Sequence, residues 1–203
     1  MIAMTKFSFK ALLAGAFLAC AFSQGASATE VNGIKFPDTV KVAGKDLVLN
    51  GAGVRTKVIF KVYAGALYVP EKVTDVDTLF KMEGPRRVRL VMMRDVTSED
   101  FGNSFMSGIN NNTDAKDKSK IITQISKFGE MFALLEGLKK GDVLDMDYIP
   151  GTGTQCYLNE KRIGAVAPEL LFYNSMLKIW LGEKPADASL KAKMLGGKKQ
   201  PAA

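Results

Sequence analysis

The sequence contains no histidine and only two cysteines, Cys20 and Cys156. The usual zinc and copper ligand sets are therefore missing, and so are the catalytic triads that depend on histidine. Any reaction or binding must rely on carboxylate, arginine, tyrosine or amide side chains. We predict no metal site, no cofactor and no catalytic residues.

Long apolar runs are equally scarce. The run Ala11 to Phe22 follows Lys6 and Lys10 and precedes the small residues Ala26 to Ala28. This order is typical of a secretory signal peptide, which we place at residues 1–28 with cleavage after Ala28. The run is shorter than a membrane span, and no later segment approaches the ~20 apolar residues that a span needs. We therefore expect a periplasmic protein without an integral membrane segment after cleavage.

Removal of this leader would leave Cys156 as the remaining cysteine, which excludes an internal disulfide. A lipid anchor on Cys20 is the alternative, but Phe17 to Ala19 match the usual lipoprotein pattern poorly. Loss of Lys6 and Lys10 leaves 26 basic and 21 acidic residues, a net charge of +5. The lysines are scattered, so we expect no nucleic-acid partner.

The length and composition suit one globular domain. The 203 residues are 47% hydrophobic and 24% charged, enough for one substantial core. We place this domain at residues 29–196 and a polar, disordered tail at 197–203. Nothing in the sequence indicates an oligomeric state.

The stretch Gly51 to Pro70 is rich in β-branched and aromatic residues and is interpreted as one central strand. Arg55 lies near its start. A guanidinium cannot be neutralised, so it must either extend to water or meet an anion, because an unpaired buried charge is costly. The pattern leaves three roles open for Arg55: a solvated side chain, an internal ion pair or an anion-binding group.

The other elements follow from hydrophobic periodicity and from helix and turn signals. Thr97 to Asp100 has the hydroxyl and acid spacing of a helix start. We predict a hairpin over 31–50 with its turn at 43–45, further strands over 87–96, 142–149, 154–158 and 162–166, and helices over 71–82, 97–112, 121–141, 168–182 and 187–195. This order predicts an α+β fold, an antiparallel sheet with helices on one face.

Four segments in this order resemble the bacterial, exported branch of the chalcone isomerase-like proteins: GAGVR, VYAGALYVP, GDVLDMDYIPGTGT and IWLGEKP. The similarity extends from about Val31 to Gly196. It implies a large antiparallel sheet layered with helices, with a cleft between them.

In the plant enzymes of this family, which cyclise chalcones, an arginine stabilises the reacting oxyanion, and Arg55 matches it. The supporting catalytic groups do not match. Tyr63 stands at the position of the catalytic threonine, Thr97 and Ser104 lie near those of the tyrosine and asparagine, and Asp187 near that of a late threonine. The resemblance therefore disfavours an isomerase, because cyclisation needs several donors directed at the developing charge.

A second branch of the family binds fatty acids and holds the carboxylate with an arginine and a tyrosine. Arg55 and Tyr63 match both positions, so we predict them as ligand-binding residues. A continuous strand would separate them by about 26 Å at ~3.3 Å per residue. They can meet only if the chain turns or bulges between them.

We expect a non-catalytic protein that binds a fatty acid or another apolar carboxylate in a cleft. The alternatives are an isomerase, that is an intramolecular lyase of the chalcone isomerase type, and a structural or interaction protein whose cleft is filled by its own side chains. An empty apolar cavity beside Arg55 would favour binding, and a packed interior would favour the last alternative.

Overall fold

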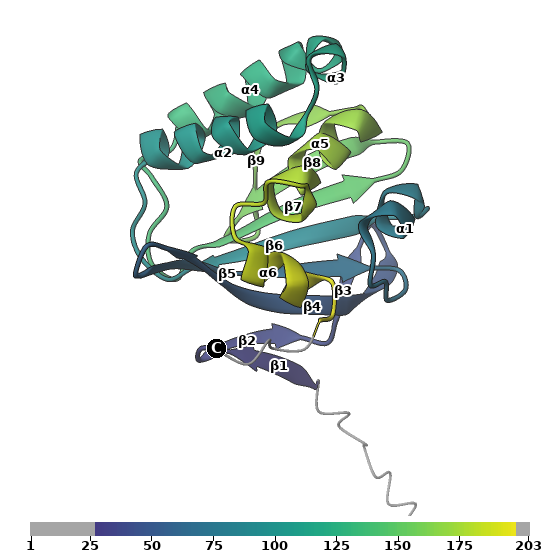
Figure 1. Cartoon of the computed structure of the whole chain (residues 1–203), viewed down its shortest axis with the longest axis vertical. Helices are drawn as coiled ribbons and strands as arrows, with labels where there is room; N and C mark the ends of the chain where they lie inside the picture. The colour runs from purple at the N-terminus through teal and green to yellow at the C-terminus, as the bar shows by residue number, and fades with distance from the viewer. Residues whose placement is uncertain (1–26, 198–203) are drawn as a thin grey trace, which may run out of the picture.

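The computed structural model describes residues 27–197 (Figure 1). The predicted leader, apart from its last two residues, and most of the predicted tail lie outside this range. The strands are β1 Ala28–Val31, β2 Ile34–Pro37, β3 Thr39–Val42, β4 Lys45–Lys57, β5 Phe60–Val69, β6 Arg86–Met92, β7 Val143–Ile149, β8 Gly153–Leu158 and β9 Lys161–Ala167. The helices are α1 Val76–Lys81, α2 Ser98–Asn112, α3 Ala115–Lys120, α4 Ile122–Ala133, α5 Leu170–Leu181 and α6 Ala188–Met194.

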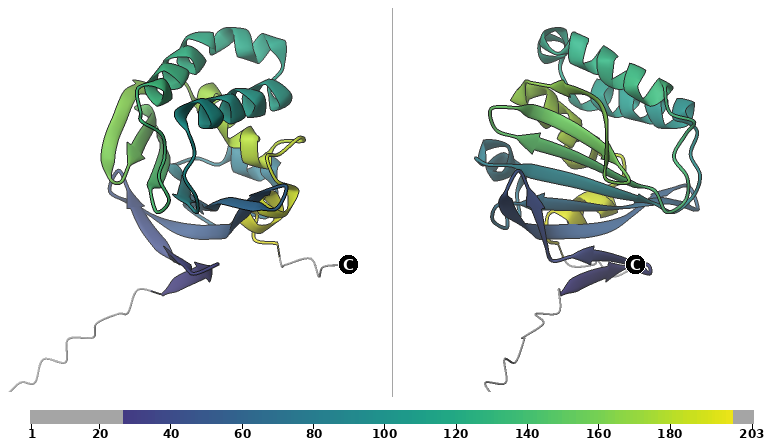
Figure 2. Two further views of the ribbon diagram at one scale, coloured as in Figure 1. Left: turned by 90° about the vertical axis from the view of Figure 1, so that its left-hand side faces the viewer. Right: turned by 180° about the vertical axis from the view of Figure 1, so that it is seen from behind.

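Strands β3 to β9 form one antiparallel sheet in which each strand pairs with the next in sequence. The sheet curls into a half-barrel, and the helices lie on its inner face (Figure 2). The main apolar core fills the space between sheet and helices. A second apolar cluster lies on the outer face of β3 to β5, where the separate hairpin β1–β2 packs on β4. The predicted α+β fold is confirmed.

Several helix starts follow from local side-chain chemistry. The Thr97 hydroxyl accepts a hydrogen bond from the N–H of Asp100, as predicted, and Asp75 and Asp187 cap α1 and α6 in the same way. These caps satisfy N–H groups that the first helical turn leaves free. Within residues 27–197, no helix is long and apolar enough to cross a bilayer.

Three predicted helices differ from the structure. The helix expected over 71–82 is only α1, because the Asp75 cap sets a later start. The helix expected over 121–141 ends at Ala133, and Leu138 instead forms a β-bridge with Val96. The strand expected over 87–96 ends at Met92, so Val96 lies outside it. Pro168 precedes α5 by two residues and does not occupy its first turn.

The single strand predicted over Gly51 to Pro70 is also wrong. The structure divides it into β4 and β5, joined by a two-residue turn at Val58 and Ile59. Val58 has a φ of 59°, a conformation that usually calls for glycine or asparagine. The sequence pattern did not predict this hairpin, because its turn lacks the glycine or asparagine that usually indicates one.

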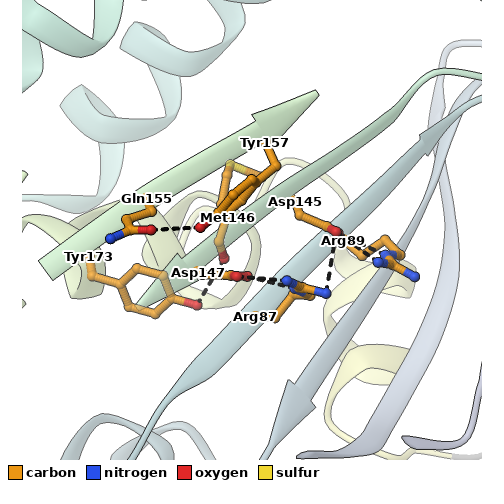
Figure 3. Close-up of polar contacts among 8 residues, drawn as sticks. All are labelled: Arg87, Arg89, Asp145, Met146, Asp147, Gln155, Tyr157 and Tyr173. Atoms are coloured by element: carbon orange, nitrogen blue, oxygen red, sulfur yellow. Dashed lines mark hydrogen bonds and ion pairs between the residues drawn. The ribbon is translucent and has the colours of Figure 1, made fainter. Parts of the chain in front are cut away.

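Two arginine–aspartate pairs cross between β6 and β7 on the outer face of the sheet (Figure 3). Arg87 binds Asp147 through two hydrogen bonds of 2.6 Å, and Arg89 binds Asp145 through two of 2.7 Å. The Asp147 and Asp145 side chains are only 3% and 7% exposed. Paired, two-pronged hydrogen bonds offset the cost of burying these charges.

Candidate functional site

Two glycines let helix α6 lie directly on strand β4. A Cβ atom at Gly51 would collide with the carbonyl oxygen of Lys193, and one at Gly53 would collide with the Lys193 side chain. Asn50 forms a bulge in β4 and donates a hydrogen bond of 2.7 Å to the carbonyl of Met194. Side chains alternate along a strand, so Arg55 follows Gly51 and Gly53 on the helix-covered face.

A second bulge brings Arg55 and Tyr63 together. Arg55 pairs with Tyr63 and Thr56 with Lys61, which leaves Val62 as the extra residue of β5. Both Val62 and Tyr63 consequently face the helices. The guanidinium carbon of Arg55 lies 5.5 Å from the centre of the Tyr63 ring, within range of a cation–π interaction. The β4–β5 hairpin thus supplies the turn on which the predicted pairing depended.

Tyr63 is oriented by helix α5. Its side chain is 4% exposed, and its hydroxyl oxygen accepts a hydrogen bond of 2.7 Å from the indole N–H of Trp180. Burial raises the pKa of Tyr63, and the nearby Arg55 charge opposes part of that shift. The phenol is therefore neutral at physiological pH. Its own proton meets no acceptor among residues 27–197, so it can be donated to a ligand.

The Arg55 guanidinium has no hydrogen bond or ion pair within the described part of the chain, and its Nε atom is buried without a partner. Asp187, the acidic group that acts on Tyr63, directs its oxygens elsewhere. One accepts from the N–H of Thr56 and the other from the N–H of Leu190, each at 2.9 Å. The internal ion pair considered for Arg55 is therefore not formed. A buried donor without an acceptor is a candidate anion-binding group.

Arg55 and Tyr63 line an apolar hollow between β5 and helices α2 and α5. The space within it that a water-sized sphere can occupy is about 40 Å³. A wider open depression, which begins at the β4–β5 turn, meets it at Arg55 and Ser104. Charged and aromatic groups thus converge where a ligand would enter. The hollow is lined by Arg55, Val62, Tyr63, Val96, Phe101, Ser104, Phe105, Ile179, Trp180 and Ala186.

Aromatic side chains close the inner end of this hollow. Phe105 stacks on Phe128 with ring centres 4.4 Å apart, and Phe128 contacts Phe172 at 5.4 Å. All three belong to the main core and are almost fully buried. The hollow therefore has room for a small head group, while an acyl chain must displace Phe105.

The residues near the positions of the enzyme's supporting groups have other roles here. The Thr97 side chain caps helix α2 and is not among the residues that line the hollow. Asp187 caps α6, and Ser104 lines the hollow beside Arg55. Within residues 27–197, no group of three or more acidic or thiol side chains is placed to bind a metal ion.

Trp180 belongs to the candidate site, although the sequence pattern did not indicate it. It is the one tryptophan of the chain and belongs to the IWLGEKP segment, but its periodicity indicated only a core position. Phe101 and Phe105 recur at helical spacing within the helix expected over 97–112, a pattern that indicates core positions, and the structure places them on the wall of the hollow. A helical stripe does not show which of its members border an empty space.

Comparisons with known proteins agree with this architecture. A family model described as chalcone isomerase-like matches residues 28–196. Among solved structures, the chain is similar to a fatty-acid binding protein of Arabidopsis thaliana, with a TM-score of 0.66 and 18% sequence identity over 83% of this chain and 96% of that chain. At this identity the similarity concerns the fold. A search of curated proteins found no match.

Proposed function

The chain belongs to the chalcone isomerase-like family, and we propose that it binds a fatty acid or another apolar carboxylate at Arg55 and Tyr63. The observation that carries this proposal is the pair of unused donors, the buried Nε of Arg55 and the proton of Tyr63, on one apolar hollow. The fatty-acid binding protein with a similar fold supports the same ligand class.

The chemistry of the two side chains suits a carboxylate. Arginine presents its N–H groups as a planar fork that can bind both oxygens of a carboxylate, and it remains charged at every physiological pH. The neutral phenol adds one donor and the apolar wall contacts the first carbon atoms of the chain. Trp180 holds the phenol oxygen, so its proton is directed away from the indole.

The aromatic cluster behind the hollow favours a second candidate, a structural or interaction protein whose cleft is filled by its own side chains. Phe105 and Phe128 occupy the space that a long acyl chain would need. The two candidates differ in whether Arg55 has a ligand. A binding measurement on one variant therefore separates them.

The test is isothermal titration of decanoate and hexadecanoate into the wild type and Arg55→Ala. A charge-assisted hydrogen bond contributes about 1.5–3 kcal/mol, so Arg55→Ala should raise the dissociation constant roughly 10- to 150-fold. Its stability should change little, because no described residue loses a hydrogen-bond partner. Arg162→Ala, which removes the same charge from exposed β9, is the matched control and should bind as the wild type does.

Two outcomes would contradict the proposal. If the wild type binds neither fatty acid, the protein belongs to the second candidate class. If Arg55→Ala binds normally but melts many degrees lower, Arg55 has a structural role and the carboxylate site lies elsewhere.

We also propose that the protein is non-catalytic and exported. The replaced supporting groups oppose catalysis, and the signal-peptide pattern of residues 1–28 supports export, with the family match beginning only at residue 28. N-terminal sequencing of protein from the periplasmic fraction should begin at Thr29. A chain beginning at Met1, or acylated on Cys20, would disprove this cleavage.

A further inference from the structure

The tip of the β4–β5 hairpin contains a residue that does not suit its backbone. Val58 and Ile59 form the two-residue turn, and Val58 has a positive φ, which Ile59 does not share. Glycine or asparagine is usual at a positive φ, as at Asn32 and Gly33 of the β1–β2 hairpin. Backbone geometry therefore gives no reason for a β-branched residue at position 58, which indicates another role for its side chain.

These side chains are also unusually exposed. Val58 is 89% exposed, Ile59 78% and Phe60 54%, and they are three of the six large apolar side chains exposed among residues 27–197. Single exposed apolar residues are ordinary, but a contiguous group is typical of an interaction site. We call Val58 to Phe60 the apolar tip.

Basic side chains surround the apolar tip. Lys57 and Lys61 flank it, and the guanidinium of Arg94 lies 4.9 Å from the centre of the Phe60 ring. Lys139 and Lys140 come from the α4–β7 loop, which contacts the segment after Arg94. Figure 1 shows that loop and the β6–α2 segment at the same end of the molecule as the hairpin turn.

The contact between these segments runs through Asp95. Its carboxylate lies 3.8 Å from the Lys139 ammonium and accepts a hydrogen bond of 2.8 Å from the N–H of Lys140. In the α4–β7 loop, Glu136 and Asp142 balance Lys139 and Lys140. Among the residues that line the depression or flank the tip, the basic Arg55, Lys57, Lys61 and Arg94 outnumber the acidic Asp95 and Asp100. The tip therefore combines an apolar point with a positive surround.

We propose that the apolar tip docks on the surface of an anionic phospholipid bilayer. Val58, Ile59 and Phe60 enter the interface, while the basic side chains contact lipid phosphates. Three residues on a narrow turn offer far less area than the roughly 1,000 Å² expected of a stable protein partner, whereas a bilayer requires no complementary surface. The positive surround matches anionic head groups.

Docking in this orientation turns the binding site toward the lipid. The depression that begins at Val58 and Phe60 continues to Arg55 and Ser104, which also line the hollow. A lipid-derived carboxylate would reach Arg55 from the membrane surface without crossing bulk water. This consequence rests on the proposed function, but the docking itself does not.

Vesicle co-sedimentation tests the docking, with residues 27–203 so that the apolar leader does not contribute. The wild type should bind vesicles of phosphatidylethanolamine and phosphatidylglycerol, and bind phosphatidylcholine vesicles much more weakly. V58N/I59G preserves the hairpin, because asparagine tolerates the positive φ of position 58 and glycine tolerates any φ at position 59. It should lose at least about tenfold in vesicle affinity, because it removes two apolar side chains from the interface.

Charge and position are tested by two further variants. K57Q/K61Q should weaken binding to the anionic vesicles by about fivefold per lysine. Ile122→Asn, at an exposed apolar residue of α4 outside the tip, is the matched control and should bind vesicles as the wild type does.

The proposal is wrong if the wild type does not sediment with anionic vesicles or if V58N/I59G binds them equally well. It is also wrong if the wild type does not bind vesicles and instead self-associates through the tip. Size-exclusion chromatography would then show an oligomer for the wild type and a monomer for V58N/I59G. Fatty-acid titration of the same samples without vesicles separates the two proposals. V58N/I59G should bind fatty acids with the same affinity as the wild type. If the wild type does not bind fatty acids, only the proposed function is contradicted.

Discussion

The indole N–H of Trp180 donates a hydrogen bond of 2.7 Å to the hydroxyl oxygen of Tyr63, although 117 positions separate the two residues. This bond joins helix α5 to strand β5 at the wall of the hollow. It orients the phenol beside Arg55, and it satisfies an indole donor that is otherwise buried. We therefore expect a change at Tyr63 to affect both stability and ligand binding, and a change at Arg55 to affect binding alone.

Tyr63→Phe should lower both properties. The buried N–H of Trp180 loses its acceptor, which should reduce the free energy of unfolding by about 1–3 kcal/mol in urea denaturation. Fatty-acid binding should weaken by only about 0.5–1.5 kcal/mol, because the lost donor is neutral. Tyr157→Phe, outside the hollow, should leave the affinity unchanged. Unaltered stability of Tyr63→Phe would show that the bond to Trp180 contributes nothing.

Phe105→Ala should shift the ligand preference toward fatty acids with longer chains. Removal of the ring opens the inner end of the hollow toward Phe128, so hexadecanoate should gain affinity relative to decanoate. The variant should also lose about 3–5 kcal/mol of stability, as large core truncations do. Phe132→Ala removes a buried ring that does not line the hollow and should lose stability without a change in chain-length preference. An identical chain-length profile in both variants would place the acyl chain elsewhere.

Asp147→Ala should destabilise the protein by up to about 3–5 kcal/mol, because it removes both hydrogen bonds of the largely buried Arg87 and leaves only its 3.4 Å contact with Asp145. Asp46→Ala breaks the exposed pair with Lys41 and should cost less than about 1 kcal/mol. Urea denaturation measures both values. Similar values for the two variants would mean that burial adds nothing to the Arg87–Asp147 pair.

Gly51→Ala should destabilise the protein by at least about 1–3 kcal/mol, since its Cβ atom would displace the backbone of α6 at Lys193. Gly129→Ala, in helix α4 with open space around it, should instead stabilise by about 0.5–1 kcal/mol. Thermal unfolding of both variants provides the comparison. A harmless Gly51→Ala would show that α6 does not need to lie this close to β4.

The protein should not accelerate chalcone cyclisation above its spontaneous rate. Each missing oxyanion donor typically costs about 2.7–4 kcal/mol of transition-state stabilisation, and Thr97 and Asp187 are committed to capping helices. Absorbance assays with a hydroxychalcone, followed by chiral chromatography of the product, measure the rate and the stereochemistry. A stereoselective, enzyme-dependent product would establish the isomerase alternative.

Sequence reasoning succeeded where neighbouring residues determine the outcome. The Thr97 cap and the turn at Ala43 and Gly44 depend on residues a few positions apart. The need of Arg55 for an anion or water follows from its chemistry alone. Together with the family resemblance, these local rules were enough to predict the α+β fold and to select Arg55 and Tyr63.

Only the tertiary structure decided whether those two residues meet. Their contact depends on a turn at Val58 and Ile59 that local rules disfavour, and on a bulge at Val62. The free proton of Tyr63 depends on Trp180, far along the chain, and the hollow exists because α2 and α5 leave a gap in front of Phe105. Such features arise from packing between segments that are distant in sequence, and local sequence patterns do not predict how those segments pack.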